Sequence, residues 1–396
     1  MTLSRRKFVQ TAGIGAGAAL TGSIWGRGRE NSIWSAIEPD LQAVERGVIC
    51  IASNENPVGP GKAVLDTLRT LLEGGTRPGR YSNQAGQLTE AIAAHFKVKP
   101  DNVLVSEGST EILRAATQVY TAKTKALVGT IPTYEECAGY AELLGHPVKG
   151  VSLDSAFKLD PDKMIAAAKG AGLVFYCNPN NPVATYVGAK ATRAFLSKLN
   201  STSPETTVLV DEAYFDYVTD PDHETHIPIA VENPRVIVAR TFSKAYGMAG
   251  LRQGYAIAHV DTIKALRPWV AAGGTGSLNV FGMAAATAAI SQDADGAFTK
   301  NERNRNKAVR DMTTKWFADR GMKATDCQAN FMFVDIGTPA KAFREACRAK
   351  GVLVARDFPP FEKTHARITL GTMEEMTKAV QVFGEVLGKK TTSAAA

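Results

Sequence analysis

Short, largely apolar runs alternate with segments of helical periodicity through most of the chain. The runs that favour β-strands lie at residues 103–106, 126–129, 173–176, 208–210 and 236–239. Helical spacing occurs between them, at residues 110–120, 134–144 and 189–199. Apolar runs of this length, bounded by turns and separated by helices, are typical of strand–helix–strand units in a mostly parallel sheet. The pattern therefore predicts an α/β fold.

A second group of elements follows a helical segment at residues 283–290. A charged helix is predicted at 298–320, and further strands and helices follow at residues 331–334, 340–350, 352–354, 367–370 and 374–387. This set predicts a smaller α+β domain. We divide the chain into a signal and linker (1–34), an N-terminal arm (35–65), a large domain (66–280) and a small C-terminal domain (281–390). The glycine-rich residues 271–277 are open to three interpretations: a hinge, an active-site loop or a plain connection.

The composition is that of an ordinary globular protein. Of the 396 residues, 44% are hydrophobic and 21% are charged, which excludes a disordered, collagen-like or coiled-coil protein. The formal net charge is +7, but residues 1–30 hold five basic residues and one acidic residue, so the rest of the chain carries only +3. A nearly balanced charge gives no electrostatic reason to bind nucleic acid or an acidic membrane. We therefore expect no nucleic-acid partner.

The first residues carry a signal of a different kind. Residues 4–10, Ser-Arg-Arg-Lys-Phe-Val-Gln, precede a weakly apolar stretch at 11–25 that is rich in Gly and Ala and short for a membrane span. This pattern resembles a twin-arginine (Tat) export signal. It implies contact with the Tat export machinery and a periplasmic or exported protein, with a cytoplasmic location as the alternative. Residues 21–23 are only a weak candidate for a cleavage site, so an uncleaved membrane anchor remains an alternative.

The five cysteines lie far apart in the sequence, and no two of them form a Cys-x-x-Cys motif. A scattered, odd-numbered set predicts neither a disulfide framework nor a zinc site. It fits a protein that folds in the reducing cytoplasm and is exported in the folded state.

The strongest chemical signal lies directly after the run at 236–239. Lys244 stands at the end of this strand among hydroxyl residues, and Arg252 follows eight residues later. A lysine in this setting can bind an aldehyde covalently while its neighbours hold a phosphate. Asp211 ends the preceding strand, and an Asn/Pro turn at 177–182 ends another. Polar groups at three strand ends predict a ligand at the carboxyl edge of the sheet.

These motifs together resemble the fold-type I, pyridoxal-5'-phosphate (PLP) dependent aminotransferases of classes I and II, and among them the histidinol-phosphate aminotransferase branch. The resemblance covers about residues 51–387. In the family's order the motifs lie at residues 52–57, 80–81, 107–111, 132–134, 178–182, 211–214, 243–244, 249–252 and 367–369. Each motif is weak alone, but the combination is highly specific. It implies that the large domain binds PLP.

The resemblance implies roles for the residues around the cofactor. The predicted catalytic residues are Lys244, Asp211 and Tyr214. Lys244 would bind PLP covalently and then act as the base that moves the substrate proton, and Asp211 would pair with the pyridinium nitrogen. Asn181 and Tyr214 would hydrogen-bond the phenolic oxygen of PLP, and Tyr134 would stack on its ring.

The phosphate is expected at the start of a helix, where unpaired backbone N–H groups and the helix dipole favour an anion. Its predicted ligands are Ser109, Thr110, Thr241, Ser243, Arg252 and, from the other subunit, Tyr81. The last assignment implies a homodimer. The predicted substrate-binding residues are Arg367, Arg356, Asn330 and Asn56. Arg367 would clamp the substrate α-carboxylate, whereas Arg356 is either a substrate ligand or a surface charge.

Two features depart from the family's pattern. The usual Asn-Pro-Thr-Gly turn reads Asn-Pro-Val-Ala at residues 181–184, which removes a hydroxyl and a glycine near the cofactor. The other departure is the export signal. Histidine biosynthesis is cytoplasmic, so an exported enzyme would be separated from histidinol phosphate. Export therefore favours free amino acids as substrates.

We predict an aminotransferase with a ping-pong mechanism. An amino acid, or histidinol phosphate, gives its amino group to the cofactor, and a 2-oxo acid then takes it. The alternatives are another PLP enzyme on the same scaffold, such as a decarboxylase, lyase or oxidase, and a non-catalytic exported binding protein. No metal is expected, because the acids and histidines at 220–226 lack the spacing of a zinc protease helix and fit an exposed acidic loop better.

Overall fold

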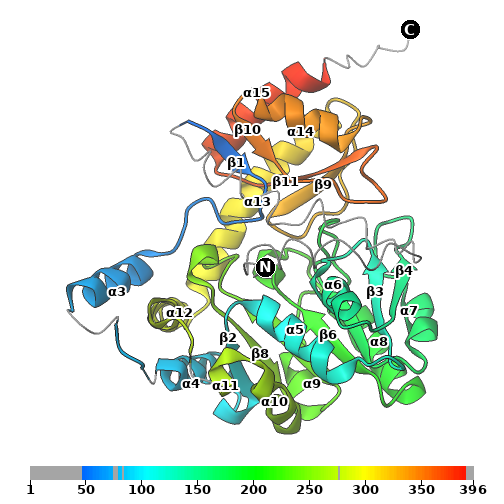
Figure 1. The fold of residues 1–396 in the computed structure, drawn as a ribbon. Helices are drawn as coiled ribbons and strands as arrows, with labels where there is room; N and C mark the ends of the chain where they lie inside the picture. The colour runs from blue at the N-terminus through cyan, green and yellow to red at the C-terminus, as the bar shows by residue number, and fades with distance from the viewer. Residues whose placement is uncertain (1–46, 75–78, 83, 275–276, 389–396) are drawn as a thin grey trace, which may run out of the picture.

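The computed structural model describes residues 47–74, 79–82, 84–274 and 277–388. The predicted signal and linker (1–34) and the first part of the predicted arm lie outside the described residues. Figure 1 shows a larger part built on a sheet and a smaller part formed mainly by the C-terminal elements. Within the described ranges, no helix is long and apolar enough to cross a membrane.

The larger part is built on a seven-stranded sheet. In sheet order, its strands are β2 (Val103–Ser106), β8 (Gly254–Ala258), β7 (Val236–Thr241), β6 (Thr207–Asp211), β5 (Leu173–Cys177), β3 (Leu127–Ile131) and β4 (Val148–Ser152). Strand β8 runs antiparallel to both of its neighbours, and the other neighbouring strands pair in parallel. The prediction of an α/β fold with a mostly parallel sheet is confirmed.

Alternate residues of the central strands face two helical layers. In β5, Val174 and Tyr176 belong to one hydrophobic cluster, whereas Leu173 and Phe175 belong to another. The first cluster includes side chains of α4 (Gln84–Phe96), α7 (Pro161–Ala168), α8 (Ala189–Thr202), α9 (Ile227–Glu232) and α12 (Val280–Gln292). The second includes α5 (Ser109–Tyr120), α6 (Glu136–Leu143) and α10 (Val260–Leu266). Burial on both faces explains why these strands are continuous apolar runs.

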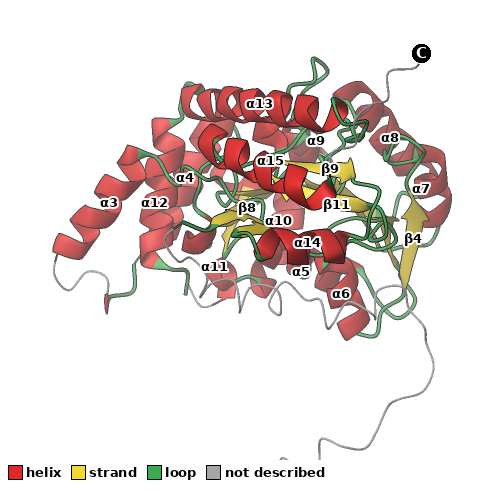
Figure 2. Cartoon of the chain, turned by 90° about the horizontal axis from the view of Figure 1, so that it is seen from above, coloured by secondary structure: helices red, strands yellow, loops and turns green. Residues whose placement is uncertain are grey.

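The smaller part combines segments from both ends of the described chain. Strands β9 (Phe331–Asp335) and β11 (His365–Thr369) pair antiparallel, and β1 (Ile49–Ile51) pairs in parallel with β10 (Val352–Val354). Helices α13 (Ala297–Ala318), α14 (Ala340–Arg348) and α15 (Met373–Leu387) complete this part, and Figure 2 shows α13 and α15 running side by side. Phe317, Phe343 and Phe383 of these helices meet in the core.

Helices α12 and α13 connect the two parts. Helix α12 begins at the predicted boundary and packs in the core of the larger part, and the division at residue 280 stays a prediction. Helix α13 begins beside the larger part, where Arg303 Nε donates to the carbonyl of Asp216 at 2.8 Å. It reaches the core of the smaller part at Val309 and Phe317. One long helix therefore holds both parts together.

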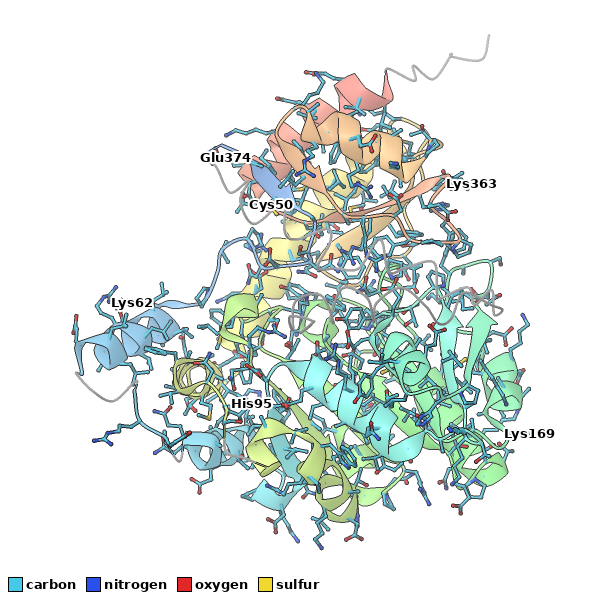
Figure 3. The ribbon with its side chains drawn as sticks, in the orientation of Figure 1. Cys50, Lys62, His95, Lys169, Lys363 and Glu374 are labelled. Carbon is cyan, nitrogen blue, oxygen red and sulfur yellow. The ribbon has the colours of Figure 1, made fainter. Side chains whose placement is uncertain are left out.

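Helix α3 (Lys62–Glu73) projects from the side of the molecule, where Figure 3 labels Lys62. It packs on α12, but Leu65 and Leu72 are exposed.

Within the glycine-rich stretch at 271–277, Ala271–Gly274 form the short helix α11. Residues 275 and 276 lie outside the described residues, so the function of this stretch stays open.

Candidate active site

Asp211 lies at the carboxyl end of β6, near the centre of the sheet edge. Its side chain is only 3% exposed. Burial raises the pKa of the carboxyl to about 6, although the backbone N–H of Ala213, 3.1 Å from Oδ1, and the nearby Lys244 charge favour the carboxylate. The Cys177 thiol lies 3.9 Å from Oδ2. A buried carboxylate of this kind is suited to pair with a protonated ring nitrogen, because water does not weaken the interaction.

Lys244 follows the end of β7, the neighbouring strand. Its Nζ donates to the carbonyl of Ser53 at 3.5 Å and lies 5.5 Å from the centre of the Tyr214 ring. Burial lowers the pKa of this amine to about 8, and the charges of Arg367 and Arg252 lower it further. A lysine with this pKa is partly neutral near pH 7 and can act as a nucleophile or accept a proton.

A phosphate-sized cradle lies at the start of α5. Ser109 and Thr110 are its first residues, and Gly108 before them has φ 74°. A Cβ atom at Gly108 would collide with the Arg252 guanidinium. Arg252 Nη1 lies 3.4 Å from Ser243 Oγ. The N-terminal amides, hydroxyls and guanidinium therefore converge in the way that anion binding requires.

Thr241 completes this region at the end of β7. Its Oγ1 accepts the backbone N–H of Ser243 at 3.1 Å. A Cβ atom at Gly254 of β8 would collide with the backbone N of Ser109. The start of α5 therefore packs directly against the strand next to the lysine loop.

Arg367 extends from β11 of the smaller part toward the sheet edge. Its Nη1 donates to Asn181 Oδ1 and its Nη2 to the carbonyl of Ala52, each at 2.7 Å. The guanidinium lies 4.6 Å from the ring centre of Phe358 and 5.5 Å from that of Phe331. Its Nε has no hydrogen-bond partner among the described residues. Burial lowers its pKa to about 10.

Arg356 lies beside Arg367 and is part of the site. Its guanidinium is 4.5 Å from the ring centre of Phe358, the ring that Arg367 also contacts. Its Nη2 pairs with the carboxylate of Glu135. Glu135 follows Tyr134, where burial raises the pKa of the hydroxyl. Arg356 is therefore not a free surface charge: it lies beside Arg367 and is paired with Glu135. Its role as a substrate ligand stays a prediction.

Asn54 is a site residue that sequence reasoning did not single out. Its Nδ2 donates to the Tyr214 hydroxyl at 3.2 Å, and its backbone N donates to Thr369 Oγ1 at 2.9 Å. Asn330 Nδ2 donates to the Asn54 carbonyl at 3.0 Å. Asn54 has φ 56°, a left-handed conformation that asparagine tolerates better than most residues. The motif at 52–57 included Asn54 but gave no reason to assign it a role.

The predicted residues Asn56 and Tyr81 lie away from the groups described above. Both polar atoms of the Asn56 amide bind backbone groups, Nδ2 the carbonyl of Ala245 at 2.9 Å and Oδ1 the N–H of Val58 at 3.1 Å. Asn56 therefore positions the segment next to Lys244. Tyr81 is 95% exposed, and its predicted contact with the other subunit stays a prediction.

The unusual turn at 181–184 is fully accommodated. Val183 is buried with Phe333, Ala355 and Phe358. Ala184 has φ 60° where the family usually has glycine, and its backbone N–H donates to Asn180 at 2.7 Å. Val183 therefore replaces a hydroxyl with apolar packing beneath the two arginines.

The acidic loop at 220–226 serves the fold. His226 Nδ1 lies 3.0 Å from Glu212 Oε1, and His223 Nε2 lies 3.0 Å from the carbonyl of Phe215. Within the part of the chain that the structure describes, no three His, Cys, Asp or Glu residues are grouped to hold a metal ion.

The model of the class I and II aminotransferase family matches residues 46–383. The chain belongs to this family. It is 32% identical to the histidinol-phosphate aminotransferase of Bacillus velezensis over 347 residues, which cover 86% of this chain and 92% of that protein. It is 33% identical to that of Moorella thermoacetica over 349 residues, 86% of each chain.

Among solved structures, the fold matches that of the histidinol-phosphate aminotransferase from Sinorhizobium meliloti in complex with pyridoxal-5'-phosphate. The TM-score is 0.80 at 24% identity, over 93% of this chain and 98% of that chain. The chain is therefore a PLP-dependent aminotransferase of fold type I, as predicted. The roles of individual site residues stay predictions.

The residues present fit PLP. The cradle at Gly108 and Arg252 would hold the phosphate of PLP. Asp211 would pair with the ring nitrogen, and Lys244 would bind the aldehyde carbon. When bound, PLP supplies an electron-accepting ring. Asp211 would hold a proton on the ring nitrogen, and Lys244 would move the substrate proton. Arg367 would bind and orient the substrate.

Proposed function

We propose that the enzyme transfers the amino group of free α-amino acids and that Arg367 binds their α-carboxylate. The observation that carries this proposal is the Arg367 guanidinium, buried at the sheet edge with an unpartnered Nε among the described residues. A carboxylate matches the planar fork of a guanidinium and forms charge-assisted hydrogen bonds with it. Asn181 and the carbonyl of Ala52 hold the guanidinium in place.

The pair of Arg356 and Glu135 supports a substrate with an uncharged distal group. Because Glu135 neutralises Arg356, no unpaired charge of Arg356 is available for a phosphate. The carboxylate of Glu135 would also repel a phosphate dianion at this distance. A substrate with an uncharged or weakly polar side chain needs no free charge on Arg356 and is not repelled by Glu135.

Histidinol phosphate is the second candidate substrate. Both relatives compared above are histidinol-phosphate aminotransferases, and Arg356 and Arg367 share the Phe358 ring. Together the two arginines could bind a phosphate if Glu135 moved away. The first candidate is favoured because it requires no such movement.

The test is amine transfer from a panel of amino acids and from histidinol phosphate, with 2-oxoglutarate and pyruvate as acceptors. We expect carboxylated donors to react. Arg367→Ala should raise KM for all of them roughly 10- to 150-fold, because a charge-assisted pair contributes about 1.5–3 kcal/mol. Arg356→Ala should affect only donors with an anionic or polar distal group. Efficient turnover of histidinol phosphate without activity on any carboxylated donor would reverse the choice.

We also propose that the enzyme is a homodimer in which Tyr81 reaches the phosphate cradle of the partner. Seven large hydrophobic side chains are exposed among the described residues, and four of them, Val58, Leu65, Leu72 and Tyr81, fall within residues 58–81. Such a concentration of exposed apolar surface favours contact with another protein. A second copy would cover helix α3 and bring Tyr81 to the site.

We further propose that the enzyme is exported through the Tat route to the periplasm. The support is the sequence of residues 4–25, with its arginine pair and Gly/Ala-rich stretch. A cofactor-dependent enzyme suits this route, because it acquires PLP while it folds in the cytoplasm. Export also agrees with free amino acids as substrates.

A further inference from the structure

An open depression of about 550 Å³ lies between helix α13 and two other segments. Charged residues of α13 line one side, and Thr219 and residues 325–328 line the other. Thr219 lies in the connection after strand β6 of the larger part, whereas residues 325–328 come just before strand β9 of the smaller part. None of these residues belongs to the active site described above. We call this space the Arg310 cavity.

Arg310 is the charge that distinguishes this cavity. Its side chain is only 6% exposed. Nη2 donates to Thr219 Oγ1 at 2.7 Å, but Nη1 has no hydrogen-bond partner and no carboxylate pairs with the guanidinium among the described residues. Burial lowers the pKa of Arg310. A buried charge without an ion-pair partner is strongly unfavourable, so the structure provides a reason for an anion to bind.

The other charges around the cavity are already paired. Lys307 pairs with Asp311 at 2.5 Å, and Lys315 pairs with Asp319 at 2.9 Å. Asp326 lies 3.5 Å from Lys158. Of the residues that line the cavity, three are basic and two are acidic, so one positive charge remains. That charge matches a monoanion better than a dianion.

We propose that the Arg310 cavity binds a small molecule that bears one carboxylate. A guanidinium forms charge-assisted hydrogen bonds with a carboxylate, and the carboxylate would supply the charge that Arg310 lacks. This proposal does not depend on the substrate or on PLP.

The hydrogen bonds in the cavity wall indicate how a bound anion would affect the stability of the protein. Gln328 Oε1 accepts from Thr219 N at 2.8 Å, and the Gln328 backbone N–H donates to Ala184 at 2.7 Å. Thr325 Oγ1 donates to Val183 at 2.5 Å. An anion at Arg310 would neutralise the charge at this junction of the two parts. It would therefore stabilise the whole protein against unfolding.

The test compares the thermal midpoint of the full-length enzyme, with its cofactor, in sodium acetate and in sodium chloride at equal ionic strength. We expect acetate to raise the midpoint by at least about 2 °C. The Arg367→Gln variant should keep this shift, because it removes only carboxylate binding at the active site. Arg310→Gln should lose the shift. A shift that Arg310→Gln keeps and Arg367→Gln loses would overturn the proposal, and a larger shift with inorganic phosphate than with acetate would overturn the choice of a carboxylate.

A second pair of variants does not alter a buried residue. Thr314 is exposed, lines the cavity and lies one turn after Arg310 on α13, so Thr314→Glu places a carboxylate within reach of the guanidinium. We expect this variant to raise the midpoint in chloride and to lose the response to acetate. Thr314→Gln, the matched control, should behave like the wild type. Equal behaviour of the two variants would contradict the proposal.

Discussion

At the scale of single residues, we expect the chemistry to depend on the Lys244 amine. Lys244→Ala should reduce turnover by at least roughly 10²–10⁴-fold, because the variant lacks the base that moves the substrate proton. The phosphate cradle at Gly108 and Arg252 stays intact, so PLP should still bind without a covalent link. Steady-state kinetics and the release of PLP on gel filtration check both expectations. Substantial transamination by the variant would refute the role of Lys244.

The state of the same amine depends on pH. Burial lowers the pKa of Lys244 from 10.5 to about 8, so the amine is mostly protonated below pH 8 and mostly neutral above it. In enzyme stripped of PLP, the rate at which an amine-directed reagent labels Lys244 should rise with pH, with a midpoint near 8. Mass spectrometry of the peptide measures the labelling, and Lys244→Arg supplies the background. A midpoint near 10.5 would show that the site does not alter this amine.

Asp211 should be needed for its charge as well as its shape. Asp211→Asn keeps the volume at the end of β6 but removes the carboxylate that would pair with the ring nitrogen. We expect most activity to be lost and PLP to be held roughly 10- to 150-fold more weakly, as for a charge-assisted pair of about 1.5–3 kcal/mol. Titration of the PLP-free enzyme with PLP, followed by absorbance, measures the affinity. Near-normal turnover would contradict the assignment.

Sequence motifs identified the residues whose chemistry is local. Lys244, Asp211 and Asn181 follow strands that are recognisable as apolar runs, so their meeting at one sheet edge could be predicted. The ion pair of Glu135 and Arg356 joins residues 221 positions apart, and no local pattern indicates it. Asn54 was missed for the same reason, because its partners Tyr214 and Thr369 come from two other regions of the chain.

At the scale of secondary structure, five strands of the large sheet were predicted, and β4 and β8 were not. Strand β4 forms one edge of the sheet, and four of its five residues are partly or fully exposed. An exposed strand has no need of a continuous apolar run, so its sequence, Val-Lys-Gly-Val-Ser, carries little signal. Helix α13 was predicted at 298–320 and observed at Ala297–Ala318, because its charged and apolar positions alternate with helical spacing.

The ends of β6 and β7 are joined by a buried ion pair. Arg240 Nη2 lies 2.8 Å from Glu212 Oε2, and the His226 N–H donates to Oε1 at 2.8 Å. Burial alone would raise the pKa of Glu212, but Arg240 and His226 hold it at about 2. This stabilisation is present above the ordinary pKa of 4.5 and is lost as pH falls toward 2.

Removing one partner of this pair should be costly. Glu212→Gln is expected to lower the free energy of unfolding at pH 7 by about 3–5 kcal/mol, because it leaves Arg240 buried with less compensation. The double variant Glu212→Gln/Arg240→Met should recover much of the loss. Urea denaturation of both variants measures the difference. A negligible effect of the single variant would mean that the pair is dispensable.

Helix α3 should determine the oligomeric state. Leu65 and Leu72 are two turns apart and therefore lie on the same face, with exposed fractions of 47% and 68%. Changing both to Asp should shift the proposed homodimer toward the monomer, as measured by light scattering after gel filtration. Leu143→Asp is the matched control, because Leu143 is 66% exposed on α6. If the α3 variant stays dimeric, another surface forms the contact.

At the scale of the whole molecule, the N-terminal signal should decide location and not activity. Changing Arg5 and Arg6 together to Lys keeps the positive charge but removes the arginine pair that the Tat machinery recognises. The variant should be active and confined to the cytoplasm, whereas the parent chain should be recovered from the periplasm. Activity measured in the two fractions checks this. Equal periplasmic recovery of both proteins would refute the targeting prediction.

Contacts between the two ends of the described chain have a consequence for synthesis. Asn54 and Thr369 are 315 residues apart, so at about 5–20 residues per second the second leaves the ribosome roughly 15–60 s after the first. The strands of the seven-stranded sheet end at Ala258 and are complete much earlier. A nascent chain halted at residue 350 has all of those strands but lacks β10 and Arg367. If Arg367 binds the substrate as proposed, we expect activity to arise only after residue 367 has been synthesised.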